Sequence, residues 1–253
     1  MRRLIFLAAF AFAAPLFAGV AYRFEVVTTG AQPSTVSGRV EADAKKMRID
    51  VERGDGMLFK DRSVILSLDG GQTMAVLDPA AKSYFVLNLS DFLGATLGSS
   101  VKFKNPHVTT RDLGNGGTIE GYPTRHAALD AGYDVEVDVM GATASTHMSI
   151  HSEMWRTDRL TALVTPFQMQ GLHTGIEALD RLVAAYDEQG KGFPLKEVTT
   201  IETKQGRQAT RSVSTSTVTH VEQRNIAAND FAIPAGYRQV TSPLRRMTQS
   251  IRE

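Results

Sequence analysis

Two histidines, His147 and His151, stand four positions apart, a spacing that would bring both onto one face of a helix to bind a metal. The residues around them favour a strand, because Met148, Ile150 and Met154 alternate with polar side chains. On a strand the two imidazoles would lie about 13 Å apart, too far for one ion. The methionines would point to the opposite face, which also removes a mixed Met/His copper site. We therefore expect solvent-facing histidines, no metal site and no cofactor.

Three carboxylates, Asp134, Glu136 and Asp138, alternate with valines and could suggest calcium binding or acid–base chemistry. Strand alternation explains the same pattern without a function, with valines inward and acids outward. If this strand pairs with the next one across a turn at 140–143, the acids would face His147 and His151. Such cross-strand pairs contribute only about 0.2–1 kcal/mol each.

Hydrolase and nucleotide motifs are absent from the sequence, including G-x-S-x-G, H-E-x-x-H, the phosphate-binding G-x-x-x-x-G-K-[ST] and a helix-opening G-x-G-x-x-G. No nucleophile–base set is visible, so we expect no enzyme and no catalytic residues. An enzyme stays a third alternative, which two titratable groups with strongly shifted pKa values in one cleft would support.

The elements that would carry these residues are mostly strands, because polar and apolar residues alternate along the chain. Turn residues such as Asp69-Gly70 separate successive strands and favour hairpins. We expect one α+β domain of about ten strands in a curved antiparallel sheet or incomplete β-barrel. The predicted strands are 22–27, 35–42, 47–51, 63–68, 73–77, 82–88, 101–108, 118–119, 124–129, 134–139, 145–155, 196–203 and 210–221.

Two or three helices should interrupt the strands. One is predicted over 90–97 with Ser90 as its N-cap, and a longer one over 174–189, ended by Gly190 and Gly192. The strand Ser212–Thr219 has little apolar character on either face. It could be a sheet edge or could border a wet cavity, and composition does not separate the two.

The N-terminus has the features of a cleaved export signal. Two arginines precede the apolar run Leu4–Ala14, Pro15 breaks it, and small residues allow cleavage after Ala18 or after Ala21. The run is too short to span a bilayer, which takes about 20 residues. We therefore expect a signal over 1–21, a domain over 22–241 and a flexible tail over 242–253. The mature protein should be soluble, periplasmic or secreted, and without a permanent membrane anchor.

Composition excludes several further classes of protein. The 253 residues carry 28 Lys+Arg against 27 Asp+Glu, so no basic excess points to nucleic acid. The sequence contains no cysteine, which excludes disulfides, thiolate metal sites and a lipid-anchored N-terminal cysteine. We expect a monomer held together by its core alone.

Five short motifs together resemble a family of exported bacterial envelope proteins known as domain of unknown function 4412. That family is similar to the LolA/LolB-like lipoprotein-carrier superfamily. The motifs, in chain order, are KKMRID at 45–50, LDPAAKSYFVL at 77–87, IEGYPTRH at 119–126, EMWRTDRL at 153–160 and NDFAIPAGY at 229–237.

The resemblance implies an incomplete antiparallel barrel around an apolar cavity, with helices as a lid and acyl chains of a lipid or lipoprotein as the ligand. No functional residue of the carriers has a matching motif here. The apolar residues of the two predicted helices are the lid or cavity candidates, although the same side chains could close a solid core. They are Phe92, Leu93, Leu97, Ile176, Leu179, Leu182, Val183 and Tyr186.

The function expected from sequence is therefore a soluble periplasmic binding protein that holds a lipid, a lipoprotein acyl chain or another apolar ligand. The alternative is a structural or interaction protein of the cell envelope with a filled core and a protein partner. A continuous apolar cavity of at least ~300 Å³ beneath the long helix would favour the first.

Overall fold

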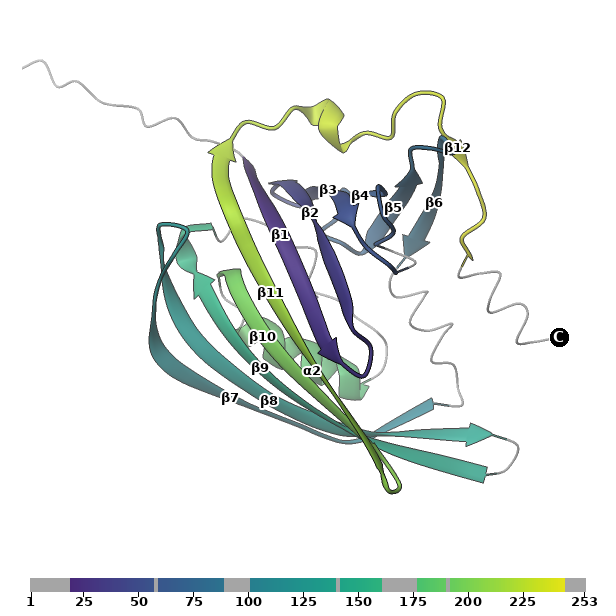
Figure 1. Cartoon of the computed structure of the whole chain (residues 1–253), viewed down its shortest axis with the longest axis vertical. Helices are drawn as coiled ribbons and strands as arrows, with labels where there is room; N and C mark the ends of the chain where they lie inside the picture. Colours follow the sequence, from purple (N-terminus) through teal and green to yellow (C-terminus); the bar gives the residue numbers. More distant parts are fainter. Residues whose placement is uncertain are drawn as a thin grey trace, which may run out of the picture.

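The computed structural model describes residues 19–56, 59–88, 101–139, 142–160, 177–189 and 192–243. These residues form one twelve-stranded sheet with the order β12-β6-β5-β4-β3-β2-β1-β11-β10-β9-β8-β7. Every neighbouring pair is antiparallel except β12 and β6, which run parallel. The sheet curves strongly and stays open (Figure 1), because its outermost strands β12 and β7 do not pair with each other. The predicted curved antiparallel sheet is confirmed, and a closed barrel is not formed.

The first half of the sheet is a meander of hairpins, as the alternating pattern predicts. Its strands are β1 (Gly19–Gly30), β2 (Ser34–Asp43), β3 (Lys46–Arg53), β4 (Val64–Ser67), β5 (Thr73–Asp78) and β6 (Ser83–Asn88). The second half holds longer strands, namely β7 (Val101–Ile119), β8 (Tyr122–Val139), β9 (Ala142–Thr157), β10 (Phe193–Gln205) and β11 (Gln208–Arg224). The short β12 (Arg238–Gln239) returns to the first half, where it pairs with β6.

Strands β7 and β8 are each continuous where the sequence predicted two separate strands. The glycine-rich residues 114–117, which lie between the two strands predicted for β7, are part of register shifts and not of a turn. Such bulges insert an extra residue without ending the strand. Asn105 has a positive φ of 51° at the first register shift of β7, and a second shift falls between Asp112 and Gly114. The hairpin therefore keeps pairing from Val101 to Ile119.

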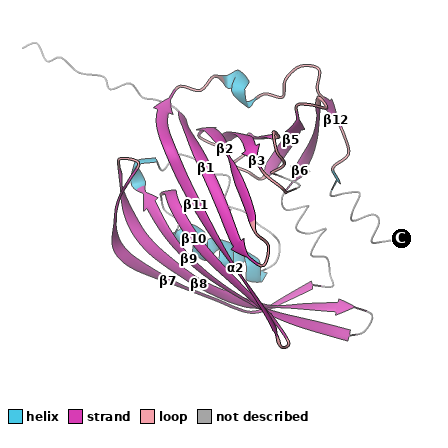
Figure 2. Ribbon diagram, in the orientation of Figure 1, coloured by secondary structure: helices cyan, strands magenta, loops and turns pink. Residues whose placement is uncertain are grey.

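Strand β11 lies in the middle of the sheet, paired with β1 on one side and with β10 on the other. The Ser/Thr-rich segment within it is therefore not an edge, because the backbone groups of both flanks are used in the two ladders. This strand joins the two halves of the sheet (Figure 2).

The main core lies on the inner, concave face of the sheet. It gathers side chains from strands far apart in the sheet order, so the sheet must curl around them. Tyr22 and Phe193 meet edge to face at 5.1 Å between ring centroids, and Ile65 of β4 belongs to the same cluster as Leu195 of β10. Ile119, at the tip of the β7–β8 hairpin, packs against this cluster.

The prediction of two or three helices is not borne out. Among the described residues there is one α-helix, α2 (Glu177–Gln189), with two 3-10 turns, η1 (Asp158–Leu160) and η2 (Ala228–Phe231). Continuous strand pairing takes up most of the chain and leaves α2 as the only helical cover in the described part. The predicted helix over 90–97 lies outside the described residues, as do 174–176 and the tail from residue 244. No described helix has the length and apolar character needed to cross a bilayer.

Candidate functional site

The two faces of β8, β9 and β10 carry different chemistry. Residues directly opposite each other in antiparallel strands share a face, so the register assigns each side chain. Thr28, Ser214, Thr199, Ser152 and Leu129 form one such row across β1, β11, β10, β9 and β8, on the inner face with the core. Neighbouring residues on the same strands point to the outer face.

Hydroxyl groups form a connected row on the inner face. The Oγ1 of Thr28 lies 2.8 Å from Oγ of Ser214. Ser152 donates to Oε1 of Glu197 at 2.8 Å, and its Oγ lies 2.9 Å from Oγ1 of Thr199. Ser214 of the polar strand β11 thus places its hydroxyl on the concave side of the sheet, whereas the adjacent Thr215 points to the outer face.

Apolar side chains lie beside the hydroxyl row, toward β7. Leu129, Ala131 and Met154 are buried in a second cluster, and the half-buried Val108 and Ile150 pack against it. Further along the hairpin, the rings of Phe103 and Tyr133 lie 5.6 Å apart, with both side chains half-buried. Part of this apolar surface remains open to solvent or to a ligand.

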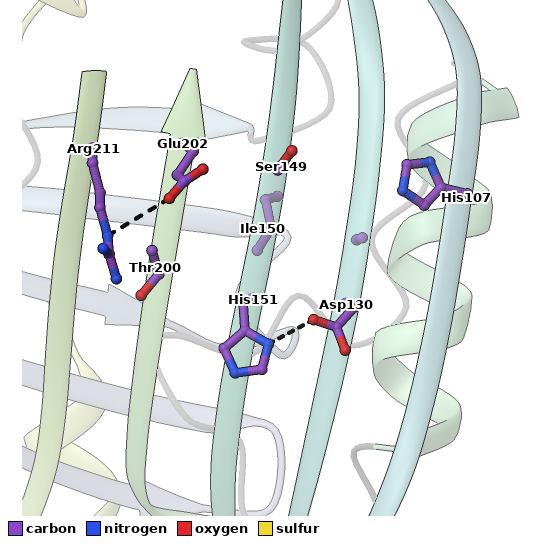
Figure 3. A pocket seen from close by; sticks show the side chains of 9 residues that line it. His107, Asp130, Ser149, Ile150, His151, Thr200, Glu202 and Arg211 are labelled. Carbon is purple, nitrogen blue, oxygen red and sulfur yellow. Dashed lines mark hydrogen bonds and ion pairs between the residues drawn. The ribbon is translucent and has the colours of Figure 1, made fainter. Parts of the chain in front are cut away.

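Helix α2 packs against β7 and β8. It lies behind the strands in Figure 1, and Figure 3 shows it on the side opposite the outer-face side chains. Of the predicted lid residues, Val183 is 7% exposed and Leu179 is half-buried. Phe92, Leu93, Leu97 and Ile176 lie outside the described residues, and the side chains of Leu182 and Tyr186 also do. The role as lid or cavity lining therefore stays a prediction for all eight residues, since burial of Val183 and Leu179 fits a filled core equally well.

The outer face carries a shallow depression of about 380 Å³ over β7 to β11 (Figure 3). Its polar lining mixes both signs of charge. The ion pair between Arg211 and Glu202 borders one side, at 3.8 Å from Nε to Oε1. The remaining lining residues are His107, Asp130, Ser149, His151 and Thr200, together with Ala131 and Ile150, which the strand register places on the inner face.

A continuous chain of charged contacts crosses this outer face. Arg111 donates to Asp130 at 2.9 Å, and the other oxygen of Asp130 lies 2.6 Å from Nδ1 of His151. Nε2 of His151 lies 3.5 Å from Glu153, whose second oxygen lies 2.8 Å from Nε2 of His126. We call these five residues the outer ladder.

Trp155 lies next to the last residue of the outer ladder, His126. The His126 imidazole stacks on its ring at 4.2 Å between centroids. Nζ of Lys196 lies 4.7 Å from the same ring, within cation–π range. The indole is thereby fixed between two polar neighbours on the solvent side of the sheet.

The outer ladder shifts the pKa values of its members. The hydrogen bond with Asp130 raises the pKa of His151, and the same bond lowers the pKa of Asp130. The hydrogen bond with His126 lowers the pKa of Glu153. These groups are all at least partly exposed, so solvent screens their interactions and each pair stabilises the fold only weakly.

A second polar group on this face has the order of a serine–histidine–aspartate relay, which the sequence did not reveal. Nδ1 of His147 lies 2.6 Å from Asp134, and Oγ of Ser149 lies 3.2 Å from Nε2 of the same ring. Asn105 donates to the other Asp134 oxygen at 2.7 Å, and this bond contributes most to the lowered pKa of Asp134. The conditional prediction that Asp134 faces His147 is confirmed, whereas His151 faces Asp130.

This relay can hold and move a proton, but its surroundings do not complete an acyl-transfer site. Ser149 pairs with Gly132 on one side and with Glu202 on the other, so its backbone N–H belongs to the sheet ladder. An oxyanion hole needs free donors near the nucleophile. The sequence indicated that His147 and Ser149 lie on the same face, because they stand two positions apart on one strand. It did not indicate which acid completes the relay, because that depends on the register of the neighbouring strand. Across the described ranges, no three His, Asp or Glu side chains are grouped to hold a metal ion.

Comparisons with known proteins place the chain in a family. No curated protein matches its sequence. A LolA superfamily protein from Nitrosomonas europaea and a DUF1329 family protein from Desulfovibrio piger are each similar with 9% identity and a TM-score of 0.31, covering 86% of this chain and 91% of theirs. A structure of PNGF-II is similar with 12% identity and a TM-score of 0.38, covering 91% of this chain and 33% of that protein. The family model described as domain of unknown function (DUF4412) matches residues 39–237, so the chain belongs to that family, as its motifs indicated.

Proposed function

We propose that the protein is a non-enzymatic binding protein of the bacterial cell envelope, exported by a cleaved signal. Its ligand is a lipid, a lipoprotein acyl chain or another apolar molecule, held against the inner face of β7 to β10 beside α2. The observation that carries the proposal is the combination on this face of half-buried apolar side chains, among them Val108 and Ile150, with the curvature of the sheet.

The apolar part of the inner face has surface left to bury. Burying a methylene group stabilises by about 0.8 kcal/mol, so an acyl chain that covers Ile150 and Tyr133 gains affinity with each carbon in contact. Both residues are half-buried in the structure. The fully buried Met154 lies on the same face and in the same cluster as Ile150.

The hydroxyl row suits the polar end of the same ligand. Ser214, Thr199 and Ser152 lie across neighbouring strands from the apolar residues, and Glu197 accepts from two of these hydroxyls. Hydroxyl groups both donate and accept, so they can bind the ester or amide of an amphiphile. A ligand with one apolar and one hydrogen-bonding end therefore fits this face better than a plain hydrocarbon does.

The proposal is tested by native mass spectrometry and organic extraction of the protein purified from the periplasm. Wild-type protein should carry an amphiphile, and Ile150→Asp should lose most of it because a carboxylate replaces an apolar contact. His151→Ala is the matched control, since the next residue points to the outer face, and it should retain the ligand. Wild-type protein that is free of lipid, or equal loss from both variants, contradicts the proposal.

The alternative of an envelope interaction protein is favoured by a different observation, the charged depression on the outer face. A partner with complementary charges could pair with Arg211 and Glu202 there. In the same purification this alternative predicts a bound protein that Arg211→Glu releases and Ile150→Asp does not.

A further inference from the structure

The junction between the expected signal and the domain falls inside the first strand. Cleavage after Ala21 would remove three residues that belong to β1. Gly19 pairs with Arg224 of β11, and Val20 pairs with Ala42 of β2 and with Gln223 of β11. Cleavage after Ala18 would leave every residue of β1 in place.

The three residues are buried as deeply as the rest of the core. Val20 is 1% exposed and Ala21 is 4% exposed, and Val20 belongs to the main cluster with Tyr22. Without residues 19–21, the end of β11 and the end of β2 would each lose the strand that pairs with them. Arg224, which pairs with Gly19, also forms an ion pair with Glu41 of β2, so both neighbours of β1 meet here.

The small size of Gly19 has a structural cause that is independent of any peptidase. A Cβ at this position would lie 2.8 Å from the carbonyl oxygen of Ala42 and 2.9 Å from Cδ1 of Ile226. The glycine of the Gly-x-Ala pattern is thus accounted for by packing between β2 and the segment after β11. The small size of Gly19 alone is therefore no evidence for cleavage after Ala21.

We propose that the signal is removed between Ala18 and Gly19. A signal peptidase adds water across that peptide bond, which leaves a carboxylate on Ala18 and an amino group on Gly19. The mature protein then begins Gly19-Val20-Ala21-Tyr22. This inference depends on the export part of the proposed function and does not depend on the ligand.

The test is N-terminal sequencing and intact mass of the full chain after expression in a Gram-negative host and release from the periplasm. A start at Gly19 is expected. A start at Tyr22 overturns the assigned site while leaving export intact, whereas an uncleaved chain that stays in the cytoplasm overturns export itself. The two failures are therefore distinguishable by mass alone.

Variants sharpen the same measurement, because cleavage is read from the mass whether or not the product folds. Ala18→Glu should abolish cleavage between residues 18 and 19, and Ala21→Val should leave that cleavage unchanged. The reverse result contradicts the assignment. As a second readout, chain 22–253 should unfold at a lower urea concentration than chain 19–253, and equal midpoints would argue against the role given to Val20.

Discussion

The inner and outer faces of β9 show how one strand serves two environments. Ile150, Ser152 and Met154 point inward to apolar side chains and shared hydroxyls, whereas His151 and Glu153 between them point outward into ion pairs. The outer face holds more titratable chemistry, yet its charges already neutralise one another at the surface. The inner face has fewer charged groups, and some of its apolar side chains, such as Ile150, are only half-buried. A richness of charged residues therefore does not by itself locate a binding site.

The largest difference between the faces should appear on truncating neighbouring residues of β9. Met154 is 0% exposed, so Met154→Ala should lower the free energy of unfolding by about 2–5 kcal/mol. Glu153→Ala removes only exposed ion pairs and should cost less than about 1 kcal/mol. Urea unfolding followed by circular dichroism measures both. Similar losses would mean that the two faces are not energetically distinct.

Two glycines extend the contrast to backbone packing. A Cβ on Gly38, on the inner face, would collide with the carbonyl oxygen of Asp50 and would lie 3.1 Å from the Phe24 ring. Since a backbone atom of β3 cannot move alone, Gly38→Ala should cost about 1–3 kcal/mol. A Cβ on Gly132 meets the end of the exposed His107 side chain, which can rotate away, and lies 3.2 Å from the carbonyl oxygen of Met148. Gly132→Ala should therefore cost less than Gly38→Ala, about 1 kcal/mol or less in thermal unfolding.

Substitutions of two serines of β9 compare the contribution of a hydroxyl group to stability on each face. Ser152 is buried and donates to Glu197, so Ser152→Ala should cost about 1–2 kcal/mol through the lost charge-assisted bond. Ser149→Ala on the outer face should change stability by no more than about 0.5 kcal/mol. Differential scanning calorimetry can rank the two variants. A larger loss of stability in Ser149→Ala than in Ser152→Ala would mean that the outer relay stabilises the fold more than its solvent exposure suggests.

The smallest expected effect is the pH dependence of the outer ladder. The raised pKa of His151 means that its contribution is fully present below about pH 6.5 and is lost as the pH rises through the folded value. The lowered pKa values of Asp130 and Glu153 give contributions that are present above about pH 4 and are lost as the pH falls. The ladder should therefore stabilise most at mildly acidic pH.

His151→Ala checks this sign directly. The difference in melting temperature between wild type and His151→Ala should be largest near pH 5–6 and should shrink toward pH 8. It should correspond to less than about 1 kcal/mol and weaken with added salt. A difference that grows with rising pH would contradict the assignment of a protonated His151 beside Asp130.

Where polar and apolar residues alternate regularly, the sequence predicted both the strands and the face of the sheet to which each side chain points. Alternation and one hairpin turn predicted that the acids at 134–138 would face His147 and His151 if the two strands paired. Which acid faces which histidine was left open. The pairing of Ser214 with both Thr28 and Thr199 could not be predicted in this way. These strands are far apart in sequence and meet only when the whole sheet has formed. In addition, β11 is polar, so it has no apolar periodicity from which its position in the sheet could be predicted.

Turn residues were the second source of error. Gly114 and Gly117 lie at register shifts of β7, where the same backbone freedom that closes a hairpin allows a strand to bend. A single sequence cannot distinguish the two uses, since the outcome depends on whether β8 continues alongside. The stacking of His126 on Trp155 also required that long pairing, and no local pattern pointed to it.

The position of β11 has a consequence for the kinetics of folding. Thr28 and Ser214 touch across 186 residues of chain, so the ladder that joins the two halves is among the most non-local in the molecule. Closing so long a loop costs entropy before any contact compensates for it, and such topologies fold slowly. The hairpins of β2 to β6 can form early, while β1 keeps one side unpaired until β11 arrives. The chain therefore cannot complete its sheet until nearly all of it is available, and completion of the β1–β11 ladder should be the slow step in refolding.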